Sequence, residues 1–182
     1  MRELSLHILD IIQNSIAAGA TRVAVRAKVD ESADRLFIRI QDNGRGMSPE
    51  FLAKVLDPFV TSRTTRNVGL GLPMFAAAAQ ACGGDLRIDS TPGKGTVVEA
   101  WFELGHIDRA PFGDITSTIV NTVAGSPDVS FRYEQVVNGR EFVFDTDEIS
   151  SQLAGVPLND PLVIGWMKPY IEEGLDRVGR VD

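Results

Sequence analysis

Asp10 and Asn14 are the first pair of side chains in this sequence whose types and spacing could support chemistry. A spacing of four residues puts both on one face of a helix, so a carboxylate and an amide would point at the same place. A carboxylate can accept a proton from water or a hydroxyl, and an amide oxygen is a hard ligand that suits Mg²⁺. For Asn14 alone, a polar stripe on an amphipathic helix is the simpler interpretation.

A second group of such residues lies at 42–47, where Asp-Asn-Gly-Arg-Gly-Met directly follows a strand-like run. A lone Asp-x-Gly-x-Gly is more often only a turn. Gly44 and Gly46 would let the backbone approach a bound molecule closely, and Met47 offers a soft apolar contact. Three more segments follow in order, namely Asp-Pro-Phe-Val-Thr-Ser-Arg at 57–63, Asn-Val-Gly-Leu-Gly-Leu at 67–72 and Gly-Lys-Gly-Thr at 93–96.

These segments, in this order, resemble the nucleotide-binding boxes of the GHKL ATPase superfamily, which includes gyrase, heat-shock chaperones, histidine kinases and MutL. Residues 10–21 resemble the N-box in its MutL-type version, and 42–47 resemble the G1 box. The F-box, G2 box and G3-type turn correspond to 57–63, 67–72 and 93–96, with Asn67 in place of the first glycine of the usual G2 pattern. The resemblance covers about residues 1–104 and implies a Bergerat-type pocket for ATP with Mg²⁺.

The resemblance also implies roles for individual residues. Asp42 would accept a hydrogen bond from the exocyclic amine of adenine, where guanine presents a carbonyl oxygen. Asn14 would be the metal ligand, and Asp10 would orient the attacking water as the catalytic residue. The superfamily usually carries Glu at the position of Asp10, so hydrolysis is expected to be slow. Further nucleotide contacts are implied at Ala18, Gly44, Gly46, Met47, Arg63, Gly69, Leu70, Gly71, Leu72 and Thr96.

Residues 57–69 follow neither a helical nor a strand period and are rich in Thr, Ser and Arg, which is typical of a long functional loop. By resemblance this loop is the ATP lid, and we expect it to be mobile without nucleotide. Gly69 and Gly71 would leave backbone amides free. The helix that begins near Pro73 would point its positive end at the phosphates.

The elements that must position these residues can be predicted from their apolar periodicity. Helices are expected at 3–16, from Ser48 to about Val55 with Ser48 as N-cap, and at 74–81 behind Pro73. Strands are expected at 21–29, 36–40, 86–89 and 97–104. The resemblance implies an α/β (α+β) fold in which helices form a two-layer Bergerat sandwich with a mixed sheet.

A small acidic α/β unit is predicted for residues 105–182, and its pattern matches no family. A helical pattern at 115–123 precedes two strand-like runs, 131–137 and 140–144, which flank the hairpin signal Asn138-Gly139. Asp145 and Glu148 stand in capping-box positions before a short helix. A last helix should run from Pro161 to about Val178, with a kink at Pro169.

Charge separates the two parts of the chain. Residues 1–104 hold 12 acidic and 12 basic side chains, whereas residues 105–182 hold 13 acidic and 6 basic ones. An acidic surface repels phosphate backbones, so we expect no nucleic-acid binding there and interpret the unit as a docking site for a protein partner, or simply as a solubilising surface. No apolar run approaches the roughly 20 residues of a membrane span, and no secretory signal is evident, so a cytoplasmic protein is expected. Cys82, the single cysteine, excludes an internal disulfide.

Three functions remain open from the sequence: a protein kinase acting in trans, a slow ATP hydrolase whose lid closure drives a conformational change, and a nucleotide-sensing module without catalysis. No phosphoacceptor helix pair precedes Asp10. An acid at that position favours hydrolysis or transfer to Ser or Thr, since histidine kinases commonly carry Asn there. Residues 105–182 are too few for the transducer domain of MutL or gyrase. We therefore expect a stand-alone, histidine-kinase-like ATPase or trans-acting kinase in regulation.

Overall fold

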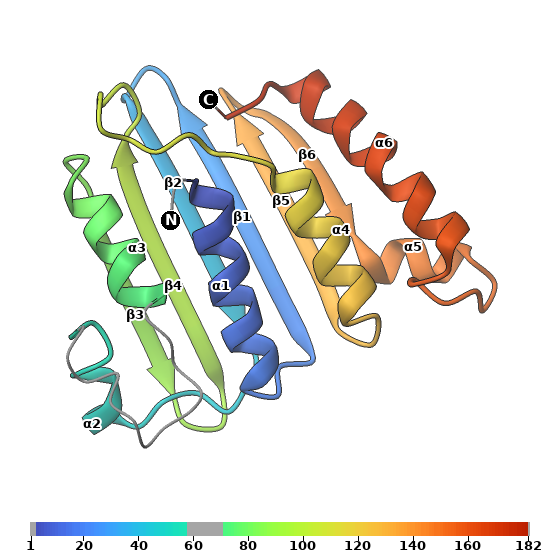
Figure 1. Cartoon of the computed structure of the whole chain (residues 1–182), viewed down its shortest axis with the longest axis horizontal. Helices are drawn as coiled ribbons and strands as arrows, with labels where there is room; N and C mark the ends of the chain where they lie inside the picture. The colour runs from blue at the N-terminus through green and yellow to red at the C-terminus, as the bar shows by residue number, and fades with distance from the viewer. Residues whose placement is uncertain (1–2, 58–70, 182) are drawn as a thin grey trace.

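A computed structural model of the chain describes residues 3–57 and 71–181. Pairs of consecutive strands are separated by one or two helices along it (Figure 1). The elements are α1 (Leu4–Ala17), β1 (Arg22–Asp30), β2 (Arg35–Asp42), α2 (Pro49–Leu52), α3 (Gly71–Gln80), β3 (Asp85–Thr91), β4 (Gly95–Glu103), α4 (Ile115–Gly125), β5 (Ser130–Val137), β6 (Arg140–Asp145), α5 (Thr146–Gln152) and α6 (Pro161–Val178). Residues 58–69 of the predicted lid, with Arg63 and Gly69, lie outside the described residues, and so does Leu70.

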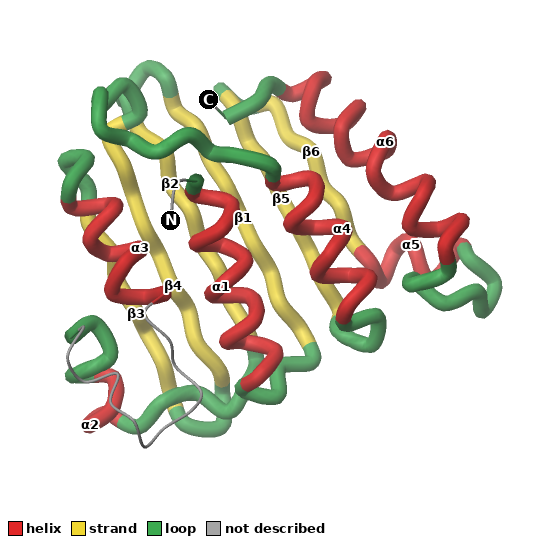
Figure 2. The backbone as a smooth tube through the Cα atoms, in the orientation of Figure 1, coloured by secondary structure: helices red, strands yellow, loops and turns green. Residues whose placement is uncertain are grey.

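The strands form one six-stranded sheet in the order β3-β4-β2-β1-β5-β6. All neighbouring pairs are antiparallel except β1 and β5, which run parallel, so the sheet is mixed. Helices α3, α1, α4 and α6 lie side by side across one face of the sheet (Figure 2). The predicted two-layer α+β sandwich is confirmed. Within the described residues, no helix covers the opposite face.

The two layers follow from alternation in the strands and from the apolar stripe of each helix. In β1, Val23 and Val25 are buried under the helices while Arg22 and Lys28 are exposed on the open face. On α1 the buried side contains Leu4, Ile8, Ile11 and Ile12, the stripe that the helical spacing predicts. One hydrophobic core therefore lies between the sheet and the helix layer.

Residues 105–181 extend the same sheet and share its core. Strand β5 pairs in parallel with β1, with Val25 opposite Tyr133, and parallel neighbours require a crossover connection. The chain makes this crossover by running across the helix layer to α4 before it enters β5 (Figure 1). Phe131 and Phe144 belong to the same buried cluster as Leu36 and Phe102. The boundary at residue 104 stays a prediction, since the two parts share one sheet.

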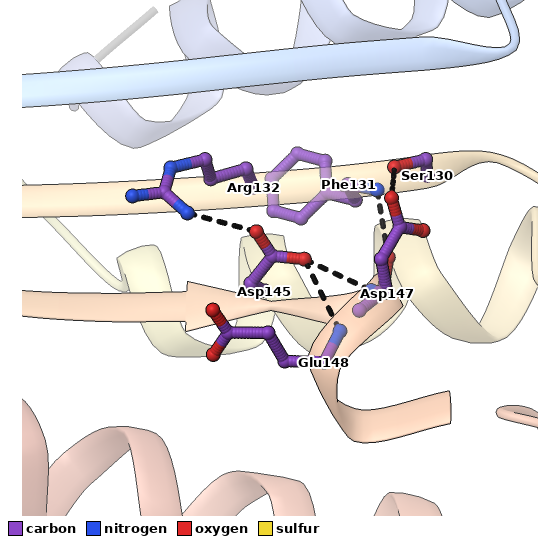
Figure 3. Close-up of polar contacts among 7 residues, drawn as sticks. Ser130, Phe131, Arg132, Asp145, Asp147 and Glu148 are labelled. Atoms are coloured by element: carbon purple, nitrogen blue, oxygen red, sulfur yellow. Dashed lines mark hydrogen bonds and ion pairs between the residues drawn. The ribbon is translucent and has the colours of Figure 1, made fainter. Parts of the chain in front are cut away.

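The junction of β5, β6 and α5 is held by polar contacts (Figure 3). Asp145 Oδ1 accepts hydrogen bonds from the backbone N–H of Asp147 at 2.9 Å and of Glu148 at 3.5 Å, so Asp145 is the N-cap of α5 as predicted. Its other oxygen pairs with Arg132 at 2.8 Å across the two strands, and Ser130 Oγ donates to Asp147 at 2.7 Å. These contacts fix the end of β6 against β5.

The clearest differences from the predicted boundaries are in α3 and α2. Helix α3 begins at Gly71, so Pro73 lies inside its first turn, where a missing backbone N–H costs nothing. Helix α2 ends at Leu52 instead of near Val55, although Ser48 caps it as predicted. Helix α6 runs from Pro161 to Val178 as predicted, and Pro169 inside it is exposed, so water can bind the backbone carbonyl that the proline leaves unpaired.

In the described part of the chain, no helix is long and apolar enough to cross a membrane.

Candidate nucleotide-binding site

A pocket with a volume of about 440 Å³ opens at the end of the sheet where β2 finishes and β4 begins. Its walls come from α1, the segment after β2, α2, the start of α3 and β4. They are Ile11, Asn14, Ser15, Ala18, Asp42, Arg45, Gly46, Met47, Ser48, Phe51, Leu72, Thr96 and Val98. An apolar cavity with a few convergent polar groups is the usual form of a small-molecule site.

Asp42, the last residue of β2, has both carboxylate oxygens held in place. Oδ1 accepts the backbone N–H of Gly44 at 2.8 Å, and Oδ2 accepts the Ser15 hydroxyl at 2.7 Å. An ionised carboxylate has about four acceptor positions, so these two bonds orient the group and leave it able to accept more. Sequence reasoning did not assign Ser15 a role, although it follows Asn14 directly and lies one helical turn after Ile11.

Close backbone approach explains why glycines occupy this segment. Gly46 has a φ of 68°, and a side chain on it would collide with the backbone of Thr91. A Cβ on Gly44 would lie 3.1 Å from the Ala18 Cβ, so the small residue on α1 and the glycine fit together. Short residues at these positions allow the 42–47 segment to lie against α1 at Gly44 and against Thr91 at Gly46.

Ser90 joins the two segments that resemble the G1 box and the G3-type turn. Its hydroxyl accepts the backbone N–H of Met47 at 2.9 Å, lies 2.9 Å from the Thr96 hydroxyl and donates to the Gly95 carbonyl oxygen at 3.1 Å. Thr96 is also the cross-strand neighbour of Asp42. The Thr96 hydroxyl is thus positioned beside the carboxylate in the pocket wall. The sequence analysis assigned Ser90 no role in the site.

Asn14 lies in the pocket wall, and its Nδ2 is buried without a hydrogen-bond partner. Such an orphaned polar atom costs free energy unless a ligand or solvent satisfies it. The described residues hold no group of three or more His, Cys, Asp or Glu side chains that could bind a metal. The other amide atom of Asn14, Oδ1, is a hard oxygen of the kind that Mg²⁺ takes alongside phosphates and water.

Asp10 lies one helical turn before Asn14 and does not line the described pocket. Its carboxylate packs against Gly71, the first residue of α3, where a side chain would collide with it. The first backbone N–H groups of a helix carry a partial positive charge and attract anions. Asp10 thus stands beside a helix N-terminus that could face phosphate groups.

The structure brings most of the predicted residues together. Around one cavity it collects Asn14, Ala18, Asp42, Gly46, Met47, Leu72 and Thr96, while Gly44 and Gly71 pack directly behind wall residues or Asp10. Phe51 and Val98 were missed, although an apolar residue in a helix just after the 42–47 segment was the available signal for Phe51.

His7 occupies the buried side of α1 away from the pocket. Its ring stacks on Phe75 with centroids 5.2 Å apart, and burial lowers the pKa of the imidazole to about 4. The side chain is therefore neutral at pH 7. The stacked ring and the burial indicate a packing role for His7.

Comparison with known families assigns residues 2–106 to the histidine kinase-, DNA gyrase B- and HSP90-like ATPases, and the chain belongs to this family. The superfamily resemblance inferred from the boxes is confirmed. Among the relatives, the chain is 38% identical over 108 residues to the sensor protein kinase FleS of Pseudomonas aeruginosa, covering 59% of this chain and 26% of that protein. It is 31% identical over 111 residues to the non-motile and phage-resistance protein of Caulobacter vibrioides, covering 56% and 13%.

The chain thus spans about a quarter or less of the length of these relatives. A crystal structure of the N-terminal domain of a DNA repair protein is similar over 79% of this chain and 52% of that one, with a TM-score of 0.55 and 18% sequence identity. That likeness concerns the fold alone.

Proposed function

We propose that this chain binds ATP with Mg²⁺ and transfers the γ-phosphoryl group as part of a regulatory system. The acceptor would be either water or a side chain of a separate partner protein. The observation that carries the proposal is the fixed orientation of the Asp42 carboxylate in the pocket. Its carboxylate is fixed by Gly44 and Ser15 in the wall of an apolar pocket, with the unsatisfied amide of Asn14 in the same wall. Because the chain belongs to an ATPase family, we infer that the ligand of this pocket is ATP.

Adenine would enter between the apolar wall residues with its exocyclic amine toward Asp42. The oriented carboxylate can accept that N–H, whereas the carbonyl oxygen of guanine would meet a second acceptor and be repelled. Thr96 lies beside Asp42 and can exchange hydrogen bonds with a ring nitrogen or a bound water. These contacts support selection of ATP over GTP.

The phosphates would extend along α1 toward Asp10. Asn14 would hold Mg²⁺, which supplies charge neutralisation for the β- and γ-phosphates when it is bound. The oxygen of the attacking water or hydroxyl would form a bond to the γ-phosphorus, and the Asp10 carboxylate would accept the proton that this oxygen loses. The bond between that phosphorus and the β–γ bridging oxygen breaks, and ADP leaves.

Two observations bear on the acceptor. One relative is named a sensor protein kinase, which favours a protein side chain as acceptor. Residues 105–182 carry the whole net charge of −7, which supports docking of a partner through this part of the chain. A nucleotide-sensing module without catalysis is the alternative, favoured if Asp10 has no effect on phosphoryl transfer. ATP and Mg²⁺ are abundant in the cytoplasm, where we propose that the protein acts.

Calorimetry with ATP and with GTP, each in the presence of Mg²⁺, tests the proposed selectivity. ATP should bind and GTP should not. Asp42→Ala should weaken ATP binding by roughly 1 to 3 kcal/mol, because it leaves the amine without its acceptor. Asp89→Ala is a matched control, since Asp89 is exposed on β3 outside the pocket. Comparable affinities for the two nucleotides would sink the role of Asp42.

A single-turnover assay with labelled ATP, run with and without cell extract, identifies the acceptor. Label on a protein indicates a kinase, and label released as phosphate indicates a hydrolase. Retention of all label in ATP under both conditions would leave the binding module as the function.

A further inference from the structure

The two edges of the sheet are built differently. Edge strand β3 places three exposed charged residues, Asp85, Arg87 and Asp89, along its length. Alternating charges of this kind discourage another strand from pairing with an edge. Edge strand β6 has the sequence Arg-Glu-Phe-Val-Phe-Asp, so its charges stand at the ends and its middle is apolar. In the described residues β6 pairs with β5 alone, which leaves its outer backbone groups free.

An apolar stripe on α6 runs beside this free edge. Leu162, Trp166 and Tyr170 recur every four residues with exposed fractions of 85%, 45% and 38%. The Tyr170 ring lies 6.0 Å from Phe142 and 6.5 Å from Phe144 of β6, and 4.6 Å from the Trp166 ring. These contacts place the stripe next to β6.

A second side of α6 is buried against the rest of the molecule. Val163, Met167 and Ile171 are buried, and the helix packs against α4 as well as β6. At Gly174 a side chain would collide with the Phe142 ring, so the glycine lets α6 lie close on the edge strand. The stripe is therefore left beside β6 because the helix is docked through another side. A free strand edge with exposed aromatic residues beside it has the composition of an interface.

We propose that this edge is where a second copy of the chain binds, through antiparallel pairing of β6 with β6 around a twofold axis perpendicular to the sheet. Directly opposed residues of antiparallel strands point to the same face. Both helix layers would then lie on one side of a continuous sheet, and the α6 stripes would face each other. One set of contacts would cover both the backbone edge and the apolar stripe, as an isologous interface requires.

The charges at the two ends of the edge favour this occupant. Arg140 begins β6, whereas Asp147 and Glu148 follow its end in the first turn of α5. Antiparallel pairing brings Arg140 of each copy toward the acidic end of the other. With the axis at Phe142, Glu141 would stand opposite Val143 of the second copy. No two carboxylates would then be directly opposed in the paired strands.

The proposed interface is separate from the nucleotide pocket. The pocket lies over β2 and β4, while β6 is the far edge of the sheet beyond β1 and β5 (Figure 1). Loss of the interface should therefore leave nucleotide binding unchanged. The inference does not depend on the function proposed above.

Sedimentation of the full chain over a range of concentrations tests the association. The expected mass is twice that of the 19.8 kDa chain. Leu162→Glu should weaken association by about tenfold or more, because it buries a charge at an apolar contact. Ile107→Glu is the matched control, since Ile107 is 95% exposed and lies in the connection before α4. Thermal unfolding of the two variants, measured at a concentration at which both are monomeric, should be the same.

A cross-link tests the pairing of the edges. A chain carrying Glu141→Cys together with Val143→Cys should form disulfide-linked dimers under mild oxidation, because each new thiol would face the other in the second copy. Arg87→Cys with Asp89→Cys on β3 should not. A chain that remains monomeric at every concentration overturns the proposal. So does a dimer that Ile107→Glu weakens as much as Leu162→Glu, or one that cross-links through β3 instead of β6.

Discussion

Two buried polar side chains on α1 have an atom without a hydrogen-bond partner in the described part of the chain, whereas two on β5 are joined in a hydrogen-bond network. On α1, His7 Nδ1 and Asn14 Nδ2 are buried without a hydrogen-bond partner among the described residues. On β5, the Tyr133 hydroxyl donates to Gln135 Oε1 at 2.7 Å, and Gln135 Nε2 donates to the Gly179 carbonyl oxygen at 2.6 Å. A satisfied network stabilises a fold, whereas an orphaned group in a pocket wall is available to a ligand.

Substitution of Asp10, on α1 close to Asn14, should give the largest effect, a loss of phosphoryl transfer. Asp10→Asn keeps the size and removes the base, so phosphoryl transfer should fall by about a hundredfold or more. The ATP dissociation constant should stay within a few-fold, because the carboxylate is not in the pocket wall. Single-turnover kinetics and calorimetry measure the two quantities. Asp10→Glu is the informative companion: faster hydrolysis would show that the short side chain limits the rate, and unchanged transfer in both variants would remove Asp10 from the mechanism.

Substitution of Gln135, in the hydrogen-bonded network on β5, should give the largest loss of stability. Gln135→Leu leaves the Tyr133 hydroxyl and the Gly179 carbonyl oxygen without partners, which should lower the free energy of unfolding by roughly 1 to 3 kcal/mol. ATP binding should be unaffected. Urea unfolding and calorimetry check the two results. Adding Tyr133→Phe to the variant should recover part of the loss, since one of the stranded groups is then gone; no recovery would argue against the network.

Substitution of Asn14 should have the opposite result to substitution of Gln135: weaker ligand binding and no loss of stability. Asn14→Ala should weaken Mg²⁺-dependent ATP binding by about tenfold, roughly 1.4 kcal/mol. The free energy of unfolding should not fall, because the substitution removes an unsatisfied buried group. Binding with and without Mg²⁺ separates metal ligation from a general contact. An equal loss in both conditions would contradict the ligand role.

His7 should give the smallest effect at neutral pH, because its contribution to stability changes only in acid. Burial lowers the pKa of its imidazole from 6.5 to about 4, so between these values the unfolded chain binds a proton that the folded chain does not. Stability should therefore fall as the pH drops from 6.5 to 4. His7→Phe, which keeps a ring against Phe75, should reduce this fall. Identical pH dependence of unfolding in the two chains would refute the buried neutral state.

Local patterns predicted the parts of the fold that local chemistry decides. Ser48 and Asp145 cap their helices as expected, and Asn138 with Gly139 makes the hairpin turn with φ values of 50° and 83°. The alternation in β1 also predicted its buried face. These features depend on neighbours a few residues away, so the sequence displays their causes directly.

Long-range contacts account for what the sequence could not show. Nothing near Ser130 indicates that β5 pairs in parallel with β1, because the decision rests on how the whole helix layer packs. The same holds at the pocket. Ser15 and Ser90 reach Asp42 and Met47 only after β2, β3 and α1 come together, so their types and spacing carry no signal of the hydrogen bonds they make.

The parallel pairing of β1 with β5 also has a consequence for how the chain folds. Arg22 pairs with Ser130, a contact of high sequence separation, and such contacts slow folding because a long loop must close first. During synthesis β1 can pair with β2 at once, but its other side has no neighbour until β5 is made. At ordinary rates of translation that interval lasts on the order of ten seconds. A nascent chain therefore presents an open, Val-rich strand edge during this time, and it is then most vulnerable to wrong associations.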